Sequence, residues 1–137
     1  MSAVFCDTSA LYAVVNRNDS AHARARRAWE ALTSDTKLQL VTTNYIVVEM
    51  ITLVQARAGI EQARQVREMF DALVRVGFVG DALHDRALDD LFAHNTRTVS
   101  FVDYTSFAFM RRHRIDTAFA HDADFVGAGF RLYEPGT

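Results

Sequence analysis

Four carboxylates occupy positions where a carboxylate is unusual. Asp7, Asp103 and Asp122 each close a short apolar run, in the segments AVFCD, VSFVD and AFAHD. Glu49 lies inside IVVEMITLV, an otherwise apolar stretch in which only Thr52 is also polar. Burying an ionised carboxylate without a partner is strongly unfavourable, so we expect these side chains to share a cation.

Such a group of acids is typical of a divalent-metal site. Carboxylates held close together repel one another, and some of them take up protons unless a cation neutralises their charge. All-oxygen ligation favours Mg²⁺, with Mn²⁺ as an alternative, and leaves coordination positions open for water and a substrate phosphate. A bound ion acidifies water and stabilises charge on a phosphate, so the acids predict hydrolysis of a phosphodiester bond.

Two hydroxyl groups lie beside these acids. Thr8 follows the first aspartate directly, and Ser106 lies one helical turn beyond Asp103 on the same face of a predicted helix. Either hydroxyl could hold a metal-bound water or a phosphate oxygen. A structural alternative stays open for each acid, because an aspartate at a strand end can cap the next helix and Glu49 can pair with an arginine.

The elements that must position these residues alternate between strand and helix patterns. Apolar runs predict strands over 3–7, 38–42, 78–80, 99–103 and 117–122, with an edge strand over 130–134. Helical spacing predicts helices over 9–15, 20–32, 44–58, 60–76, 85–95 and 103–111. We expect Thr8 or Ser9 to cap the first helix, Gly77 to end the fourth, and the helices around Gly59 to form a hairpin.

This alternation predicts an α/β fold, one domain over residues 1–137 with a central parallel sheet flanked by helices. Parallel sheets bind ligands at the carboxyl ends of their strands. Three strands that end in aspartate, and a helix that carries Glu49, are therefore expected to converge on one crevice.

Length and composition exclude several other classes. The chain has 137 residues, 50% of them hydrophobic, and one proline, which indicates a compact globular protein. A net charge of -2 excludes a strongly basic nucleic-acid binder, but a metal ion can still bring nucleic acid to an acidic site. Cys6, the single cysteine, excludes an intrachain disulfide. Without a leader-like or membrane-spanning run, we expect a cytoplasmic protein that contacts no membrane.

Three segments resemble, in order and spacing, the PIN-domain ribonucleases of the VapC type, which are toxins of type II toxin–antitoxin pairs. They are DTSALYAVVNRND, TTNYIVVEMITLV and SFVDYTSFAFMRRHRIDTAFAHDADF. The resemblance assigns the family's four acidic positions to Asp7, Glu49, Asp103 and Asp122, with Asp7 and Asp103 as the usual core magnesium ligands. The two hydroxyls named above match the family's hydroxyl positions.

The resemblance implies a PIN-like domain that hydrolyses RNA with a metal-activated water, leaving a 3′-hydroxyl and a 5′-phosphate. It also implies a homodimer that a cognate VapB-type antitoxin inhibits. One departure is Asp124 in HDADF, where many relatives have a basic residue or histidine. This extra acid either helps to bind a second metal ion or is solvated.

Two other functions stay open from the residues alone. A small-molecule phosphatase with an aspartyl-phosphate at Asp7 would need a second aspartate two residues later, where this chain has Ser9. A non-catalytic binding module would use the same acidic cleft without cutting anything.

The arginine clusters also allow two interpretations. The run RRHR at 111–114 either complements a helix C-terminus or contacts RNA phosphates or an acidic antitoxin segment. The same alternatives apply to four arginines near the start of the chain: Arg17, Arg24, Arg26 and Arg27.

Overall fold

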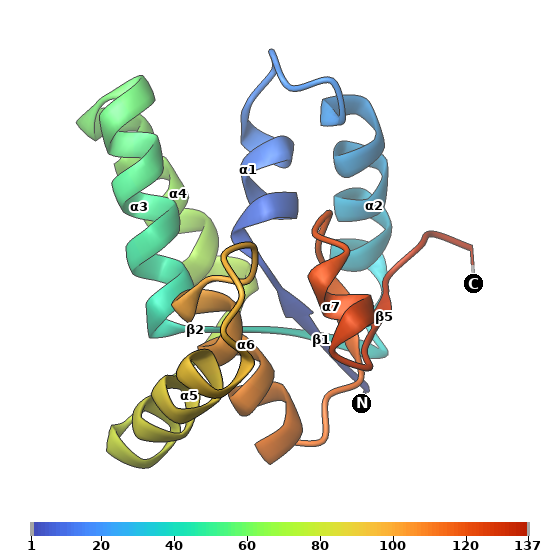
Figure 1. The fold of residues 1–137 in the computed structure, drawn as a ribbon. Coiled ribbons are helices and arrows are strands. Elements are labelled where there is room, and N and C mark those ends of the chain that lie inside the picture. Colours follow the sequence, from blue (N-terminus) through green and yellow to red (C-terminus); the bar gives the residue numbers. More distant parts are fainter. Residues whose placement is uncertain (1, 137) are drawn as a thin grey trace.

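One five-stranded parallel sheet, in the order β3-β2-β1-β4-β5, forms the centre of the molecule (Figure 1). The computed structural model describes residues 2–136. Its strands are β1 (Ser2–Cys6), β2 (Leu38–Thr43), β3 (Arg75–Gly77), β4 (Thr117–Phe119) and β5 (Arg131–Leu132). All neighbouring strands pair in parallel, which confirms the α/β fold and the edge strand near the C-terminus.

Helices connect the strands, mostly as packed pairs. The pairs are α1 (Thr8–Val15) with α2 (His22–Ser34), α3 (Asn44–Ala58) with α4 (Ile60–Leu73), and α5 (Asp81–His94) with α6 (Phe101–Arg112); the short α7 (Asp124–Gly127) precedes β5. Figure 1 shows the members of each pair side by side, and the α3–α4 pair is the predicted hairpin around Gly59. Within residues 2–136, no helix combines the length and apolar character needed to cross a bilayer.

The strand order decides which helices cover which face of the sheet. Parallel crossovers are almost always right-handed. Since the chain moves from β1 outward to β3 and then returns past β1 to β4, the first two helix pairs cover one face and α5, α6 and α7 cover the other. The order reverses between β1 and β4, and the crevice at the carboxyl ends of two such strands is where open parallel sheets bind ligands.

Strand alternation fills the two layers with aromatic rings. Phe5 of β1 packs against Phe109 of α6 and Phe125 of α7, with ring centroids 6.1 and 6.3 Å apart. Phe119 of β4 points to the opposite face and stacks on Trp29 of α2 at 6.0 Å. All five side chains are buried. The strands that frame the crevice are therefore held from both sides.

The strand predicted over 99–103 is wrong, because Ser100 starts helix α6 instead. The Ser100 hydroxyl accepts a hydrogen bond from the Asp103 N–H at 3.1 Å, and the Asp103 carboxylate accepts one from the Ser100 N–H at 3.0 Å. This reciprocal capping box outweighs the strand preference of the apolar residues around it. Asp103 consequently lies in the first turn of a helix and not at a strand end.

Two other boundaries differ from the sequence pattern. The strand predicted over 78–80 is wrong, because α4 ends at Leu73 and β3 follows almost at once, so that Gly77 ends a strand and not a helix. Phe78, which suggested the strand, is 77% exposed. The first helix is capped by Asp7, not by Thr8 or Ser9.

Gly77→Ala is expected to lower the free energy of unfolding by about 1–3 kcal/mol, the usual cost of overpacking a core. An added Cβ would lie 2.5 and 2.6 Å from two ring atoms of Phe109, whose buried side chain cannot move aside freely. Urea unfolding measures the change. Gly127→Ala is the matched control, because nothing lies within 4 Å of its Cβ position.

A double-mutant cycle identifies the clash. Phe109→Leu is expected to cost less in the Gly77→Ala background than in the wild type, since the shorter side chain removes the overlap. If Phe109→Leu costs the same free energy of unfolding in both backgrounds, the Phe109 ring is not the reason that a side chain at position 77 destabilises the protein.

Candidate active site

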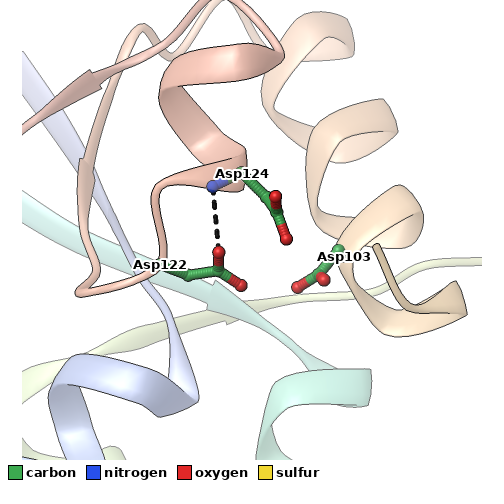
Figure 2. Close-up of side chains that lie close together, drawn as sticks. All are labelled: Asp103, Asp122 and Asp124. Carbon is green, nitrogen blue, oxygen red and sulfur yellow. Dashed lines mark hydrogen bonds between the residues drawn. The ribbon is translucent and has the colours of Figure 1, made fainter. Parts of the chain in front are cut away.

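Three aspartates from two segments form a close acidic cluster. One carboxylate oxygen from each of Asp103, Asp122 and Asp124 lies within 4.8 Å of the others. Figure 2 shows Asp103 on α6 facing the other two, of which Asp122 lies in the loop after β4 and Asp124 begins α7. No other group of three or more His, Cys, Asp or Glu side chains within residues 2–136 is as close. The gap between these oxygens has the size and chemistry of a divalent-cation site.

A local turn places two of these aspartates side by side. β4 ends at Phe119, so the strand predicted over 117–122 is too long and Asp122 lies in the loop that follows. The Asp122 carboxylate accepts a hydrogen bond from the Asp124 N–H at 2.9 Å (Figure 2). This Asx-type turn starts α7 and keeps both side chains at the cluster. The sequence left the role of Asp124 open, and the structure places it among the clustered acids.

Asp7 is the buried member of the acidic group, with only 4% of its surface exposed. Its Oδ2 accepts hydrogen bonds from the Ser9 N–H at 3.0 Å and from the Ser9 hydroxyl at 2.6 Å. Burial raises the pKa of Asp7 to about 6, and the charges of Asp103 and Glu49 add to the rise, while the two Ser9 bonds oppose it. Asp7 is thus within electrostatic reach of Asp103 and Glu49, although neither Asp7 nor Glu49 belongs to the close cluster.

Glu49 is half-buried on α3. It lies beside an exposed face of the helix, which the nearly continuous apolar sequence does not predict. Ile46, Met50 and Val54 are buried against the core, whereas Val48 is 65% exposed. Among the described residues Glu49 forms no ion pair with an arginine. The expected salt-bridge alternative for this glutamate therefore finds no support in the structure.

Two buried hydroxyl groups beside the acids have no hydrogen-bond partner among residues 2–136. They are Thr8 Oγ1, next to Asp7, and Ser106 Oγ, one turn beyond Asp103. Buried hydroxyls are nearly always hydrogen-bonded, so each of these is a candidate partner for a water or a ligand oxygen. Clustered carboxylates with spare hydroxyls beside them fit a partly hydrated Mg²⁺ or Mn²⁺ ion.

Two acids of the cluster, Asp103 and Asp124, have pKa values raised above that of a free aspartate. Burial raises the pKa of Asp103, with a further rise from the charges of Asp122 and Asp124, against hydrogen bonds from Ser100 that lower it. The pKa of Asp124 is also raised, by burial and by neighbouring Asp122. A divalent cation would neutralise the negative charges that repel one another. This is the electrostatic reason to expect a cation here.

Ser9 is a site residue that sequence reasoning missed. Its hydroxyl donates to Asp7 and accepts a hydrogen bond from the His121 N–H at 3.0 Å. It therefore ties the start of α1 to the segment that carries Asp122 and Asp124. The bond from Ser9 to Asp7 could be inferred from the DTS segment, since the two residues are close in sequence. The bond from His121 could not, because His121 is 112 positions away along the chain.

Comparison with known proteins identifies the class. A family model described as the PIN domain matches residues 4–130, a span that contains every acid and hydroxyl discussed above. The chain therefore belongs to the PIN-domain family. The resemblance that the three sequence segments suggested is confirmed.

Among its relatives is the 23S rRNA-specific endonuclease VapC20 of Mycobacterium tuberculosis, which is 37% identical over 133 residues, 96% of this chain and 98% of the relative. The crystal structure of VapC20, described as a sarcin–ricin loop cleaving toxin, matches with a TM-score of 0.85 and covers 96% of this chain and 99% of that one. VapBC2 from Rickettsia felis matches at 10% identity with a TM-score of 0.71, covering 96% and 98% of the two chains, and this likeness concerns the fold alone.

Metal-free Asp7→Asn is expected to be more stable than the wild type at pH 8, by up to about 3 kcal/mol. The pKa of Asp7 rises from 3.8 to about 6 on folding, and each unit corresponds to about 1.4 kcal/mol. Because the folded-state pKa is raised, the penalty is complete above about pH 6 and disappears as the pH falls toward 3.8.

Thermal unfolding in EDTA between pH 4 and pH 8 measures this difference. Asp116→Asn, at a side chain that is 75% exposed, is the control and should track the wild type at every pH. A wild type as stable as Asp7→Asn at pH 8 would contradict the burial of an ionisable group at this position.

Ser9→Ala is expected to weaken Mn²⁺ binding by about tenfold or more, the usual effect of removing a group that orients a metal ligand. The alanine loses both the bond to Asp7 and the tie to the His121 backbone. Ser9→Thr keeps a hydroxyl and should restore most of the affinity. Calorimetric titration measures both variants, and equal affinities for Ser9→Ala and the wild type would remove Ser9 from the site.

Proposed function

We propose that this protein is a magnesium-dependent endoribonuclease, the toxin of a type II toxin–antitoxin pair. The observation that carries the proposal is the cluster of Asp103, Asp122 and Asp124 beside the buried Asp7, at the point where the strand order of a PIN fold reverses. The 37% identity with an rRNA-specific endonuclease across 96% of the chain supports the same enzyme class.

Each residue then has a role that its surroundings support. The clustered aspartates and Asp7 would hold Mg²⁺, with Mn²⁺ as a substitute. When bound, the ion acidifies a water molecule and neutralises charge on the scissile phosphate. Ser9 holds Oδ2 of Asp7, so that Oδ1 is available as a ligand or as a proton acceptor. The unpartnered hydroxyls of Thr8 and Ser106 can hold a water or a phosphate oxygen, and Glu49 adds negative charge beside Asp7.

The proposed substrate is 23S rRNA at the sarcin–ricin loop. The relative VapC20 is named as a 23S rRNA-specific endonuclease, and its crystal structure is described as that of a sarcin–ricin loop cleaving toxin. The match covers nearly the full length of both chains at 37% identity, which supports the same substrate for this chain.

The proposal extends to the partners and the place of action. The chain would act as one nuclease domain over residues 1–137, as a homodimer, in the cytoplasm where ribosomes are found. A VapB-type antitoxin would inhibit it. The phosphatase alternative finds no support, since Ser9 stands where the second aspartate would be needed and its hydroxyl is engaged by Asp7 and His121.

Asp103→Asn is expected to slow cleavage of a sarcin–ricin hairpin in Mg²⁺ by about 100-fold or more, because it removes a charge that acts at the reacting phosphate. Glu49→Gln, outside the close cluster, should cause a smaller loss while the free energy of unfolding stays the same or rises. Gel electrophoresis of end-labelled RNA gives the rates, and the products should carry 5′-phosphate and 3′-hydroxyl ends.

Asp89→Asn, an exposed acid on α5, is the matched control and should cut at the wild-type rate. Wild-type cleavage that continues in EDTA would rule out a metal-dependent reaction. Asp103→Asn cutting as fast as the wild type in Mg²⁺ would rule out the assigned site.

A further inference from the structure

A groove of about 980 Å³ lies between the α1–α2 pair and the α3–α4 pair. Three arginines and one histidine line it, Arg17, His22, Arg26 and Arg57, and the described residues of its lining include no aspartate or glutamate. In a chain of net charge -2, this is a local concentration of positive charge. Neither the acidic site nor the fold explains it.

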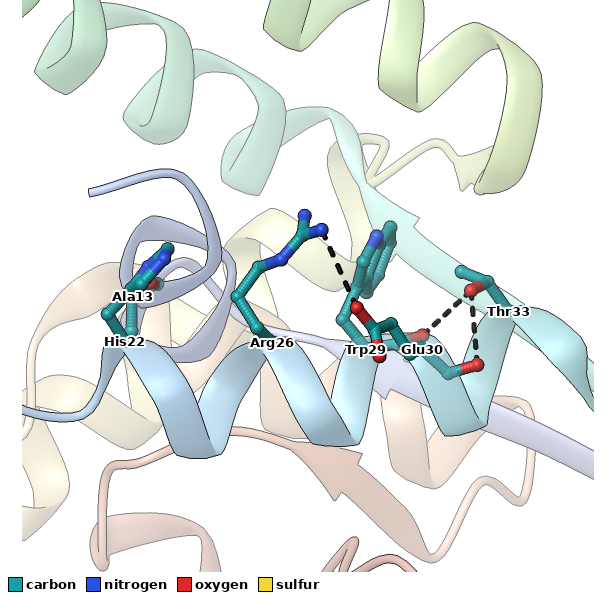
Figure 3. A network of polar contacts seen from close by, with 6 residues as sticks. All are labelled: Ala13, His22, Arg26, Trp29, Glu30 and Thr33. Atoms are coloured by element: carbon teal, nitrogen blue, oxygen red, sulfur yellow. Dashed lines mark hydrogen bonds and ion pairs between the residues drawn. The ribbon is translucent and has the colours of Figure 1, made fainter. Parts of the chain in front are cut away.

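The arginines of the groove are available to a ligand. Within residues 2–136, Arg17 and Arg57 form no ion pair with an acid, and the Arg57 guanidinium lies 5.6 Å from the centre of the Tyr12 ring, which orients it. Arg26 contacts Glu30 at 3.6 Å, but both side chains are at least half exposed, so this pair is weak (Figure 3).

A hydrogen bond keeps the two helices on one side of the groove together. The His22 ring Nδ1 donates to the Ala13 carbonyl of α1 at 2.8 Å. Figure 3 shows both residues near the extended Arg26 side chain of α2. Since a carbonyl only accepts, the proton must lie on Nδ1. This bond holds Arg26 and the rest of α2 next to α1, the helix that Asp7 caps.

The groove and two of the site's acids, Asp7 and Glu49, lie along the same two helices, α1 and α3. α1 starts at Asp7 and reaches Tyr12 after five residues, about 7.5 Å of helix, while α3 carries Glu49 and reaches Arg57 after eight residues, about 12 Å. Both helices leave the carboxyl edge of the neighbouring strands β1 and β2, and they contact each other (Figure 1). The groove is therefore about one to two helical turns from Asp7 and Glu49, a separation that a few nucleotides of RNA can span.

We propose that this groove binds the phosphate backbone of the RNA substrate a few nucleotides from the bond that is cut. The inference rests on the proposed ribonuclease function and adds the surface that positions its substrate. Guanidinium groups bind phosphate oxygens through paired hydrogen bonds. Four amide side chains at the groove can reach ribose hydroxyls: Asn16, Asn18, Gln62 and Gln65.

The test is the double variant Arg17→Gln/Arg57→Gln, compared with Arg64→Gln/Arg67→Gln. The control removes the same charge from α4 at side chains that are 62% and 77% exposed and lie outside the groove lining. Binding of a fluorescent sarcin–ricin hairpin is followed by anisotropy in EDTA at several salt concentrations, and cleavage is then measured in Mg²⁺. Thermal unfolding checks that all variants are folded.

The groove variant is expected to bind the RNA about tenfold more weakly, and its salt dependence should fall by about 0.7 in log–log slope for each of two lost phosphate contacts. KM should rise with kcat nearly unchanged, while the control matches the wild type. A wild type that binds this RNA without cutting it would refute the proposed function but leave the groove supported by the binding data.

Two results would overturn the inference: unchanged RNA affinity and salt slope in the groove variant, or an equal loss in the control. If unchanged RNA affinity comes with weaker binding of a polyglutamate peptide, the groove is assigned to an acidic protein segment instead.

Discussion

Carboxylates that lie within 4.8 Å of one another repel, and the fold holds Asp103, Asp122 and Asp124 at that separation beside a buried Asp7. The repulsion among these charges opposes their assembly when no cation is bound. The surrounding core must therefore keep the crevice closed, and the aromatic layers on both faces of β1 and β4 supply rigid packing next to it. The packing energy of the core thus balances the electrostatic repulsion among the acids of the site.

The acids also complete the helices on which they depend. Asp7 caps α1, Asp103 closes the capping box of α6, and Asp122 accepts the bond that starts α7. Bonds from backbone N–H groups at a helix start stabilise a carboxylate, so they offset part of the repulsion in the crevice. One carboxylate can therefore cap a helix and still be available to bind a metal ion. The two roles that the sequence analysis treated as alternatives are compatible.

A negatively charged protein that acts on RNA must attract a polyanion locally. The clustered acids would do this through a divalent ion, and the groove between the helix pairs would do it through Arg17, Arg26 and Arg57. The groove lies further along α1 and α3, the helices that carry the cap Asp7 and the acid Glu49. This arrangement explains how a net charge of -2 is consistent with a nucleic-acid substrate.

The sequence by itself determined the alternation of strands and helices and the hairpin around Gly59, and it singled out the candidate acids, because apolar periodicity and unusual carboxylates are local signals. It misplaced Asp103 in a strand, since a capping box competes with an apolar run over the same five residues. Only the tertiary structure decided that Asp124 joins the cluster and that Ser9 contacts His121. Both depend on β4 returning beside β1, a strand order that no local pattern encodes.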